Sequence, residues 1–385
     1  MFGLPFALTS ALWLLVAVTS PAVAKDEGVV CPTGNMYSCT CVNPRSVNTT
    51  YGFAPTEEHL LSELHCDNVD FDEYGVSGIP SDLPFVRSAF FTRMTFEEMP
   101  EMPQNFAQLQ FLYFRQNVIG KFPAKRFQNL KSLSHLYIEN NQVTNGAKLQ
   151  AGVFFGLESV TVMNISNNTG WLGVRSGVFS QQSLPKVLEI VLCNNGLFDI
   201  EDDAFQNATS LSTLLLAQNQ LTIVPRLSSA PLGRLHHLDL SFNRLQNLHN
   251  LYHMPNLTSL VLHHNALTVI AADAFKHVKT RLTFLDLSYN QLATVAPTAF
   301  MSLLNLTELD LDNNRLRRVL WEELPWNDSV RHGKLARITL YSNPWHCDCR
   351  NEFLAEGNRV IDAYNFGEKA LKYNGRPSQY TLTTI

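Results

Sequence analysis

The chain repeats one pattern of hydrophobic and polar positions from Leu109 to Trp345. Its leucines follow the order LxxLxLxxN, and a further apolar residue comes two places after the asparagine. Alternate residues of a strand share one face, so each copy predicts a short strand whose leucines enter a core shared with its neighbours. The asparagines recur every 22–29 residues, at Asn117, Asn141, Asn168, Asn195, Asn219, Asn243, Asn265, Asn290, Asn314 and Asn343.

Each asparagine stands where the chain leaves its strand. We expect its carboxamide to turn inward and to hydrogen-bond to the backbone of adjacent copies, where water cannot reach those polar groups. Two degenerate copies precede the regular ones, and in the second Met94 stands at the asparagine position. A phenylalanine recurs between the strands, and we expect these rings to stack along the convex side: Phe106, Phe127, Phe154, Phe179, Phe205, Phe275 and Phe300.

The repeat length is typical of leucine-rich repeats. The predicted fold class is an α/β solenoid, a leucine-rich repeat horseshoe with parallel strands on the concave face. We also predict a disulfide-stapled amino-terminal cap and an incomplete carboxyl-terminal cap. The predicted division is a signal peptide (1–24), a cysteine-containing amino-terminal cap (25–82), the repeat array (83–342) and a partial carboxyl-terminal cap (343–385).

The composition indicates a protein with a substantial core. The 385 residues are 45% hydrophobic and 16% charged, with a formal net charge of −5, which favours neither disorder nor a nucleic-acid partner. Residues 1–24 combine an apolar run with small residues at Ala22 and Ala24, and we expect cleavage after Ala24. The run is shorter than the roughly 20 apolar residues of a membrane span. The chain as given is therefore predicted to be secreted, soluble and without a membrane partner.

Sequons and cysteines agree with an extracellular location. Cys31, Cys39, Cys41 and Cys66 precede the array, and an even set in an oxidising compartment predicts two disulfides. Three connectivities are open, and a zinc site is the disfavoured alternative because secreted thiols oxidise. Seven Asn-x-Ser/Thr sequons predict N-glycosylation at Asn48, Asn164, Asn167, Asn207, Asn256, Asn305 and Asn327.

The region from Cys31 to Cys349 resembles extracellular leucine-rich repeat proteins, through the repeat template, the cysteine cap and the motif NPWHCDC at 343–349. The resemblance implies pairing of Cys31 with Cys41 and of Cys39 with Cys66. The amino-terminal CP and CTC pattern looks most similar to secreted arthropod proteins, such as the non-catalytic subunit of Oplophorus-luciferin 2-monooxygenase. That similarity implies a small secreted catalytic subunit as a partner.

The carboxyl-terminal cap of such proteins pairs its two CxC cysteines with two later ones, and this sequence has no cysteine after Cys349. We expect a truncated or mispredicted end; a cap bridged to another chain and free thiols at Cys347 and Cys349 are the alternatives. A missing tail could include a membrane anchor. Cys193 is unpaired in the pattern and is expected to face solvent, as a free thiol, an intermolecular bridge or an incidental cysteine.

The positions between the strand leucines face the open side of the sheet, and their character changes along the array. The central positions are Phe90, Tyr113, Tyr137, Asn164, Val191, Leu215, Asp239, Val261, Asp286, Asp310 and Thr339. Tyrosine and arginine are common in binding hot spots. We therefore predict a ligand-binding patch at Arg87, Phe90, Arg93, Phe111, Tyr113, Arg115 and Tyr137.

Two simpler interpretations apply to this face. Exposed strands favour aromatic residues without any ligand, and the later acids (Asp239, Asp286, Glu308, Asp310 and Asp312) are expected to form a solvated surface. A glycan on Asn164 would project between the two patches, so either this sequon is unused or ligands bind at one end only.

The sequence contains no recognisable catalytic motif. HExxH, P-loop, GxGxxG and GxSxG motifs are all absent, so we predict no enzyme, no catalytic residues and no cofactor. His236 with His237 and His263 with His264 suggest a metal site, but the first pair occupies the start of its strand and the second pair the end. At ~3.3 Å per residue most of these rings would lie ~10 Å apart, whereas zinc needs ligands within about 2.2 Å. We predict no metal.

The predicted function is a secreted, non-enzymatic recognition or scaffold protein that binds an extracellular protein or glycan on its concave face. One alternative is a non-catalytic accessory subunit of a secreted luciferin monooxygenase-like complex. Another is an ectodomain fragment of a Toll-like or adhesion receptor.

Overall fold

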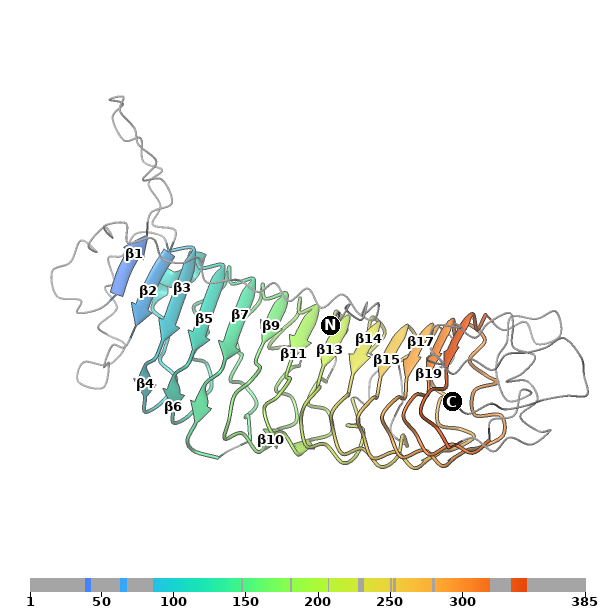
Figure 1. The fold of residues 1–385 in the computed structure, drawn as a ribbon. Coiled ribbons are helices and arrows are strands. Elements are labelled where there is room, and N and C mark those ends of the chain that lie inside the picture. Colours follow the sequence, from blue (N-terminus) through green and yellow to red (C-terminus); the bar gives the residue numbers. More distant parts are fainter. Residues whose placement is uncertain are drawn as a thin grey trace, which may run out of the picture.

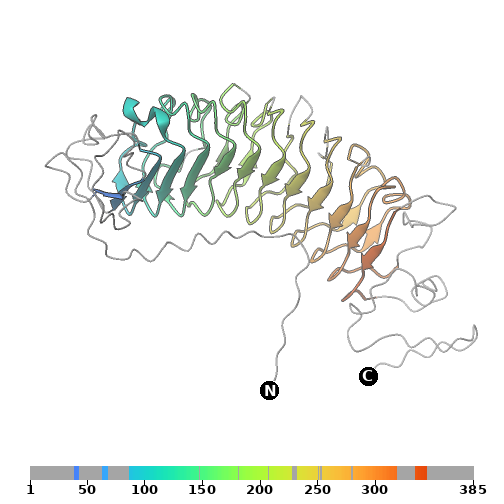
Figure 2. The ribbon, with the colours of Figure 1, turned by 90° about the horizontal axis from the view of Figure 1, so that it is seen from above.

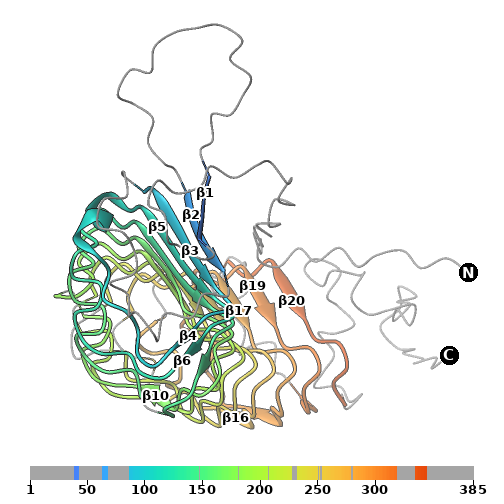
Figure 3. The same ribbon diagram turned by 90° about the vertical axis from the view of Figure 1, so that its left-hand side faces the viewer.

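The structure, a computed structural model, describes residues 39–42, 63–67, 86–146, 148–180, 182–206, 208–227, 232–249, 251, 254–278, 281–318 and 334–344. Each coil contributes one strand to a single curved sheet, and the strands follow one another in chain order (Figures 1 and 2). The strands are parallel, except that β1 is antiparallel to β2. In the view along the solenoid the strands line one wall and the return segments close the other (Figure 3).

The main sheet is formed by β1 (Cys39–Val42), β2 (Glu63–Asp67), β3 (Ser88–Thr92), β5 (Phe111–Arg115), β7 (His135–Glu139), β9 (Val162–Asn164), β11 (Glu189–Val191), β13 (Thr213–Leu215), β14 (His237–Asp239), β15 (Ser259–Val261), β17 (Phe284–Asp286), β19 (Glu308–Asp310) and β20 (Arg337–Thr339). Small sheets in the return segments join β4 (Thr95–Phe96), β6 (Val118–Ile119) and β8 (Gln142–Val143), then β10 (Gly173–Val174) with β12 (Asp199–Ile200), and β16 (Val269–Ile270) with β18 (Thr294–Val295).

This architecture confirms the predicted solenoid with parallel strands. Its helical part is slight: among the described residues the return segments are turns, short strands and the 3-10 helix η2 (Gln104–Gln108), with no α-helix.

Strand residues alternate between the core and the open face. In β5, Leu112 and Phe114 are fully buried, whereas the three residues around them are partly exposed. The same alternation holds in β7 and β9, because successive side chains of a strand point to opposite faces, whereas in β14, β15 and β20 the last outward residue is buried as well. The leucines of the template therefore form the core, and the positions between them form the concave surface.

The asparagine ladder is confirmed. Asn141 donates from Nδ2 to the carbonyl of Phe114 at 3.0 Å, and its Oδ1 accepts the N–H of Asn117 at 2.9 Å. From Asn243 onward the Oδ1 atom instead accepts the N–H of the residue two places after the preceding asparagine, for example Leu221 at 3.0 Å. Asn219 accepts both kinds of bond, so the bonding pattern switches at that coil.

The phenylalanine spine is confirmed in two runs. All seven phenylalanines that the pattern singled out are fully buried. Ring centroids lie 6.2 Å apart for Phe127 and Phe154, 5.5 Å for Phe154 and Phe179, and 5.2 Å for Phe179 and Phe205. The second run joins Phe275 to Phe300 at 5.9 Å.

At the amino-terminal end, Cys66 is disulfide-bonded, and the β1–β2 register places Cys39 opposite it. The register agrees with the predicted pairing of these two cysteines, which stays a prediction. Cys31, the leader, the sequons Asn48, Asn207 and Asn327, and the cap cysteines Cys347 and Cys349 lie outside the described residues. No helix in the described part of the chain is long and apolar enough to cross a membrane.

Candidate binding site on the concave face

Four aromatic rings stack across the first coils of the concave face. His65 of β2 stacks on Phe90 of β3 with centroids 4.4 Å apart, and Phe90 stacks on Tyr113 of β5 at 4.4 Å. Tyr113 in turn stacks on Tyr137 of β7 at 4.6 Å, and each pair is within 4° of parallel. We call His65, Phe90, Tyr113 and Tyr137 the concave aromatic ladder.

Strand pairing produces this stack. The four residues are direct neighbours in the parallel register of β2, β3, β5 and β7. Adjacent strands lie ~4.8 Å apart, which is close to the separation at which aromatic rings stack. A second, shorter row runs beside the ladder, where Phe111 and His135 stack with centroids 4.8 Å apart.

The stacking determines what the ladder can offer a ligand. The faces of Phe90 and Tyr113 are covered by neighbouring rings, so a ligand meets ring edges and the two tyrosine hydroxyls. Burial raises the pKa of Tyr113, and burial together with Tyr113 raises the pKa of Tyr137 to about 12. Both hydroxyls therefore keep their protons at neutral pH and can donate hydrogen bonds to acceptors of a ligand.

The arginines of the predicted patch lie apart and hold different partners. Arg115 lies over the Tyr113 ring at 5.2 Å and donates from Nε to Glu139 at 2.8 Å. Arg93 is paired with Asp67 beyond the strand ends, where this guanidinium holds the pKa of Asp67 below its usual range. Arg87 donates from Nε to the side-chain oxygen of Gln110 at 2.9 Å, at the opposite end of the strands.

Glu139 closes the ladder on its carboxyl-terminal side. Its Oε2 accepts from Arg115, and its Oε1 accepts from Nδ2 of Asn164 at 2.6 Å. Nδ2 is the atom that would carry a glycan, so glycosylation of Asn164 would require this contact to rearrange. Burial also raises the pKa of Glu189 on β11, two strands beyond Glu139.

The structure thus brings Phe90, Tyr113, Tyr137 and Arg115 together, places Phe111 in the adjacent row, and sets Arg87 and Arg93 at the margins. Sequence reasoning missed His65, His135 and Glu139. His65 and His135 were accessible to it, since both occupy outward positions of the template. Glu139 was not, because its role depends on which side chains the register places beside it.

The acidic positions farther along the face are enclosed to different degrees, so only part of the expected solvated surface is found: Glu308 keeps 44% of its side chain exposed, whereas Asp239 is buried. Asp239 is only 5% exposed and accepts the N–H of Ser241 at 2.8 Å. Burial raises the pKa of Asp310, and burial together with repulsion from Asp310 raises the pKa of Asp312 to about 7. The concave wall encloses these carboxylates, which bond to backbone N–H groups near their own strands.

Cys193 is half-buried rather than facing solvent, which corrects the expectation for this residue. Burial raises the pKa of its thiol to about 12, with Asp239 contributing repulsion. A thiol with so high a pKa is a poor nucleophile.

His237 begins β14 as predicted, whereas His263 and His264 lie just beyond the end of β15 rather than at its end. Nδ1 of His263 lies 2.9 Å from Nδ1 of His264. Within the described ranges, no group of three or more His, Cys, Asp or Glu side chains has the arrangement of a metal site.

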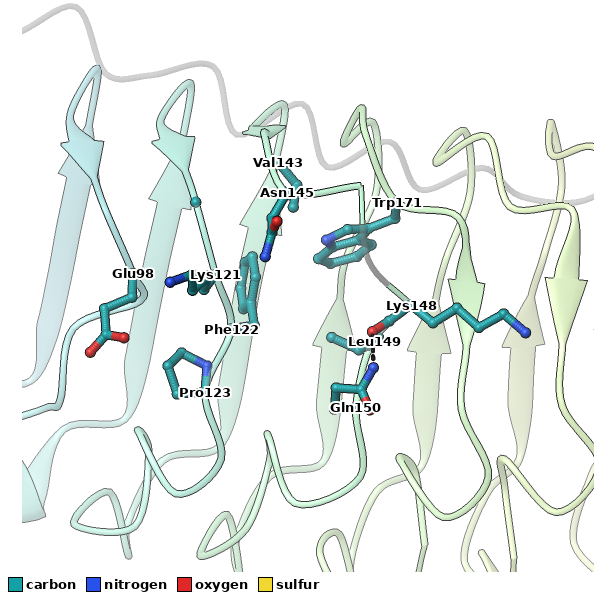
Figure 4. A pocket seen from close by; sticks show the side chains of 11 residues that line it. Glu98, Lys121, Phe122, Pro123, Val143, Asn145, Lys148, Leu149, Gln150 and Trp171 are labelled. Carbon is teal, nitrogen blue, oxygen red and sulfur yellow. Dashed lines mark hydrogen bonds between the residues drawn. The ribbon is translucent and has the colours of Figure 1, made fainter.

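A pocket of about 380 Å³ opens on the return side of the early coils (Figure 4). Its wall includes Phe122 and Trp171, whose rings meet edge to face at 5.4 Å. Trp171 is only 4% exposed, so its ring offers little surface to a ligand. Lys148 extends away from Phe122 and is paired with Asp199 and Glu201. The pocket has few converging polar groups, and the concave aromatic ladder is the stronger candidate.

Comparison with known proteins agrees with this geometry. Residues 185–245 and 255–316 match the family described as leucine rich repeat. Leucine-rich repeats are therefore present over these residues of the chain. This repeat protein is 32% identical over 247 residues to podocan-like protein 1 of Mus musculus, covering 63% of this chain and 41% of that protein. It is 28% identical over 278 residues to lumican of Coturnix japonica, covering 68% of this chain and 77% of lumican.

Solved structures support the fold of the repeat protein. A chain in the octameric complex of latrophilin 3, Unc5D and FLRT2 superposes with a TM-score of 0.54 at 23% identity, covering 72% of this chain and 81% of that chain. A chain of the mouse RP105/MD-1 complex gives a TM-score of 0.56 at 19% identity, and the match covers 79% of this chain and 55% of that chain. The matched family and the relatives named here are repeat proteins, and they indicate no catalytic family. The resemblance to a luciferin monooxygenase subunit stays a prediction.

Proposed function

We propose that this leucine-rich repeat protein is a secreted, non-enzymatic recognition protein that binds another extracellular protein on its concave aromatic ladder. The observation that carries the proposal is the continuous stack of His65, Phe90, Tyr113 and Tyr137 on the open side of four neighbouring strands. The leader-like segment and the sequons support secretion.

The charge around the ladder favours a protein over a polyanionic glycan. Arg93 and Arg115 are paired with Asp67 and Glu139, so their charges are largely compensated within the site. A sulfated or otherwise polyanionic ligand gains most from uncompensated cations. A protein segment instead gains from apolar ring edges and from hydroxyl donors that meet its backbone carbonyls.

Crosslinking tests the proposal directly. A photo-crosslinking phenylalanine analogue replaces Phe90 in one bait and the exposed Phe198, which lies outside the ladder, in a matched bait. Both are exposed to native secretion, and adducts are identified by mass spectrometry. We expect one protein to be enriched on the Phe90 bait. Equal adducts on both baits would contradict the proposal.

Binding affinities of variants then test which residues of the concave face contact the partner. With the identified protein, Tyr113→Ala combined with Arg115→Ala should weaken binding at least 10-fold without unfolding the chain, because a hot-spot tyrosine and arginine together contribute about 2 kcal/mol or more. Tyr341→Ala combined with Arg175→Ala removes the same residue types elsewhere and should leave affinity unchanged. A stoichiometric small oxygenase among the partners would support the accessory-subunit alternative instead.

A further inference from the structure

One residue in every regular coil, directly before the asparagine position, has a left-handed backbone. Its φ lies between 51° and 58° at Arg93, Gln116, Asn140, Asn167, Asn194, Gln218, Phe242, His264, Tyr289, Asn313 and Ser342. This conformation lets the N–H of each residue reach the next coil, as where Gln218 donates to the carbonyl of Ser241 at 3.0 Å and Asn313 to that of Tyr341 at 2.8 Å. The repeat itself therefore requires the left-handed conformation.

Three consecutive coils place rings at this position, namely Phe242, His264 and Tyr289. Asparagine is the side chain that tolerates the left-handed region best after glycine, whereas bulky residues are disfavoured there. The rings do not alter the backbone hydrogen bonds. The N–H of Phe242 donates to the carbonyl of His263 at 2.9 Å, and the N–H of Tyr289 donates to the carbonyl of Asp312 at 2.9 Å. The fold thus gains nothing from aromatic residues here that asparagine would not supply.

The three rings form a second stack, which we call the rim ladder. Phe242 and His264 have centroids 4.2 Å apart at 19°, and His264 and Tyr289 have centroids 4.2 Å apart at 12°. Phe242 is 42% exposed and Tyr289 is 50% exposed. In the described part of the chain, no ring stacks on the second face of Tyr289. The rim ladder follows the ends of β14, β15 and β17, in the yellow and orange coils of Figure 1.

The coil that follows the rim ladder carries Asp310 and Asp312. The N–H of Tyr289 donates to the backbone carbonyl of Asp312 at 2.9 Å, so Asp312 holds the position next to Tyr289 that His263 holds next to Phe242. Asp312 Oδ1 accepts the N–H of Tyr341. Crowding with Asp310 and Asp286 adds to burial in raising the pKa of Asp312.

The charges of these acids are only partly compensated. Arg337 pairs with Glu308 at 3.8 Å. Burial and Asp286 raise the pKa of Asp310, while the charge of Arg337 lowers that pKa. Local negative charge beside an exposed ring face is complementary to a cationic, planar group.

We propose that Tyr289 and Asp312 bind an arginine side chain of an extended, basic segment of a partner protein, with Phe242 and His264 as the apolar shelf beside it. A guanidinium stacks on aromatic faces within about 6 Å of the ring centroid and donates to carboxylates at the same time. Lysine offers a point charge and cannot stack in this way. The rim ladder lies at the opposite half of the array from the concave aromatic ladder, so this inference does not depend on the function proposed for that site.

A synthetic peptide tests the proposal on the full chain. A fluorescein-labelled 12-residue peptide of alternating Arg and Gly is titrated with the protein, and fluorescence anisotropy reports binding. Peptides of the same length with Lys or Glu in place of Arg serve as comparisons. We expect saturable binding of the Arg peptide, at least 5-fold weaker binding of the Lys peptide and no binding of the Glu peptide.

Three variants locate the site. Tyr289→Asn and Asp312→Asn should each lower the affinity for the Arg peptide at least 10-fold. Gln218→Asn, at the same left-handed position one coil before the rim ladder, should leave its affinity unchanged. Tyr289→Asn installs the residue that other coils use at this position, so its melting temperature should not fall, and loss of binding would not reflect unfolding.

Several results would overturn the proposal. These are no saturable binding of the Arg peptide, equal affinity for the Arg and Lys peptides, or unchanged affinity in Tyr289→Asn. Binding of a neutral oligosaccharide or of anionic vesicles that is lost in Tyr289→Asn, with no binding of the Arg peptide, would assign the rim ladder to another ligand and would overturn it as well.

Discussion

Arg115 donates from Nε to Oε2 of Glu139 at 2.8 Å while both side chains are mostly shielded from solvent. The pair couples the edge of the concave aromatic ladder to the next strand. It also makes the sign of the charge at this site depend on one carboxylate. Two neighbouring charges that compensate each other contribute orientation and specificity more than affinity.

Glu139→Gln should therefore change what the concave face attracts. The variant leaves Arg115 without its counter-charge, and we expect a loss of about 1 kcal/mol in unfolding free energy together with longer retention on a heparin column. Glu158→Gln makes the same charge change at an exposed pair with Lys131. Equal retention of the two variants would show that Arg115 is not the cation released.

Asn141→Ala should lower the free energy of unfolding by more than the small size of the deleted side chain suggests. The side chain accepts the N–H of Asn117 and donates to Phe114, and both groups lie where water cannot replace it. We expect a loss of about 2–4 kcal/mol in unfolding free energy, measured by urea denaturation, because two or more buried partners lose their bonds. Gln142→Ala, at the exposed next residue, should stay within about 0.5 kcal/mol of the parent.

Gly170→Ala should be among the most damaging single changes. Gly170 has φ +91°, and an added Cβ would lie 1.8 Å from the carbonyl oxygen of Val143 in the preceding coil. We expect a loss of about 2–5 kcal/mol in unfolding free energy. Gly146 also has positive φ, at +54°, but has open space around it, so Gly146→Ala should cost only about 1–2 kcal/mol. Similar losses at the two positions would contradict the close approach.

The pH dependence of stability should report Asp312. Burial and the neighbouring carboxylate raise its pKa to about 7 from a model-compound value of 3.8, so the folded state holds its proton to higher pH than the unfolded chain does. The contribution of Asp312 to stability therefore falls as the pH rises from about 4 to about 7 and is constant above that.

Asp312→Asn keeps the acceptor for Tyr341 and removes the titration. The free energy of unfolding is measured by chemical denaturation at pH 5 and at pH 8. Between these two pH values, the parent should lose about 1–2 kcal/mol more of this free energy than the variant does. Parallel profiles for the two proteins would place the pKa of Asp312 in its ordinary range.

Cys193 should react slowly with alkylating reagents in the folded protein. Burial raises the pKa of the thiol to about 12, so little thiolate is present at pH 8. Mass spectrometry of the peptide that contains Cys193 measures the reaction after timed treatment with iodoacetamide. Complete labelling in urea is the control, and rapid labelling without urea would refute the prediction.

The sequence by itself determined the coil. A leucine at alternate positions and an asparagine at each strand exit predict one strand and one inward carboxamide, because burial and hydrogen bonding act on those residues in every copy. For the same reason, the positions from Phe90 to Thr339 form one column in the strand register, as predicted, although Asp239, Val261 and Thr339 are buried rather than solvent-facing. The phenylalanine spine followed from its period alone.

Only the tertiary structure decided what those outward residues do together. Whether Arg115 faces solvent or Glu139 depends on a residue 24 positions away that stacking makes a neighbour, and the burial of Asp312 depends on how the coils pack around it. Phe242, His264 and Tyr289 look unrelated in the chain, and their common left-handed backbone and their stacking appear only when coils are superposed. A local pattern specifies each coil, whereas charge pairing and ring stacking arise between coils.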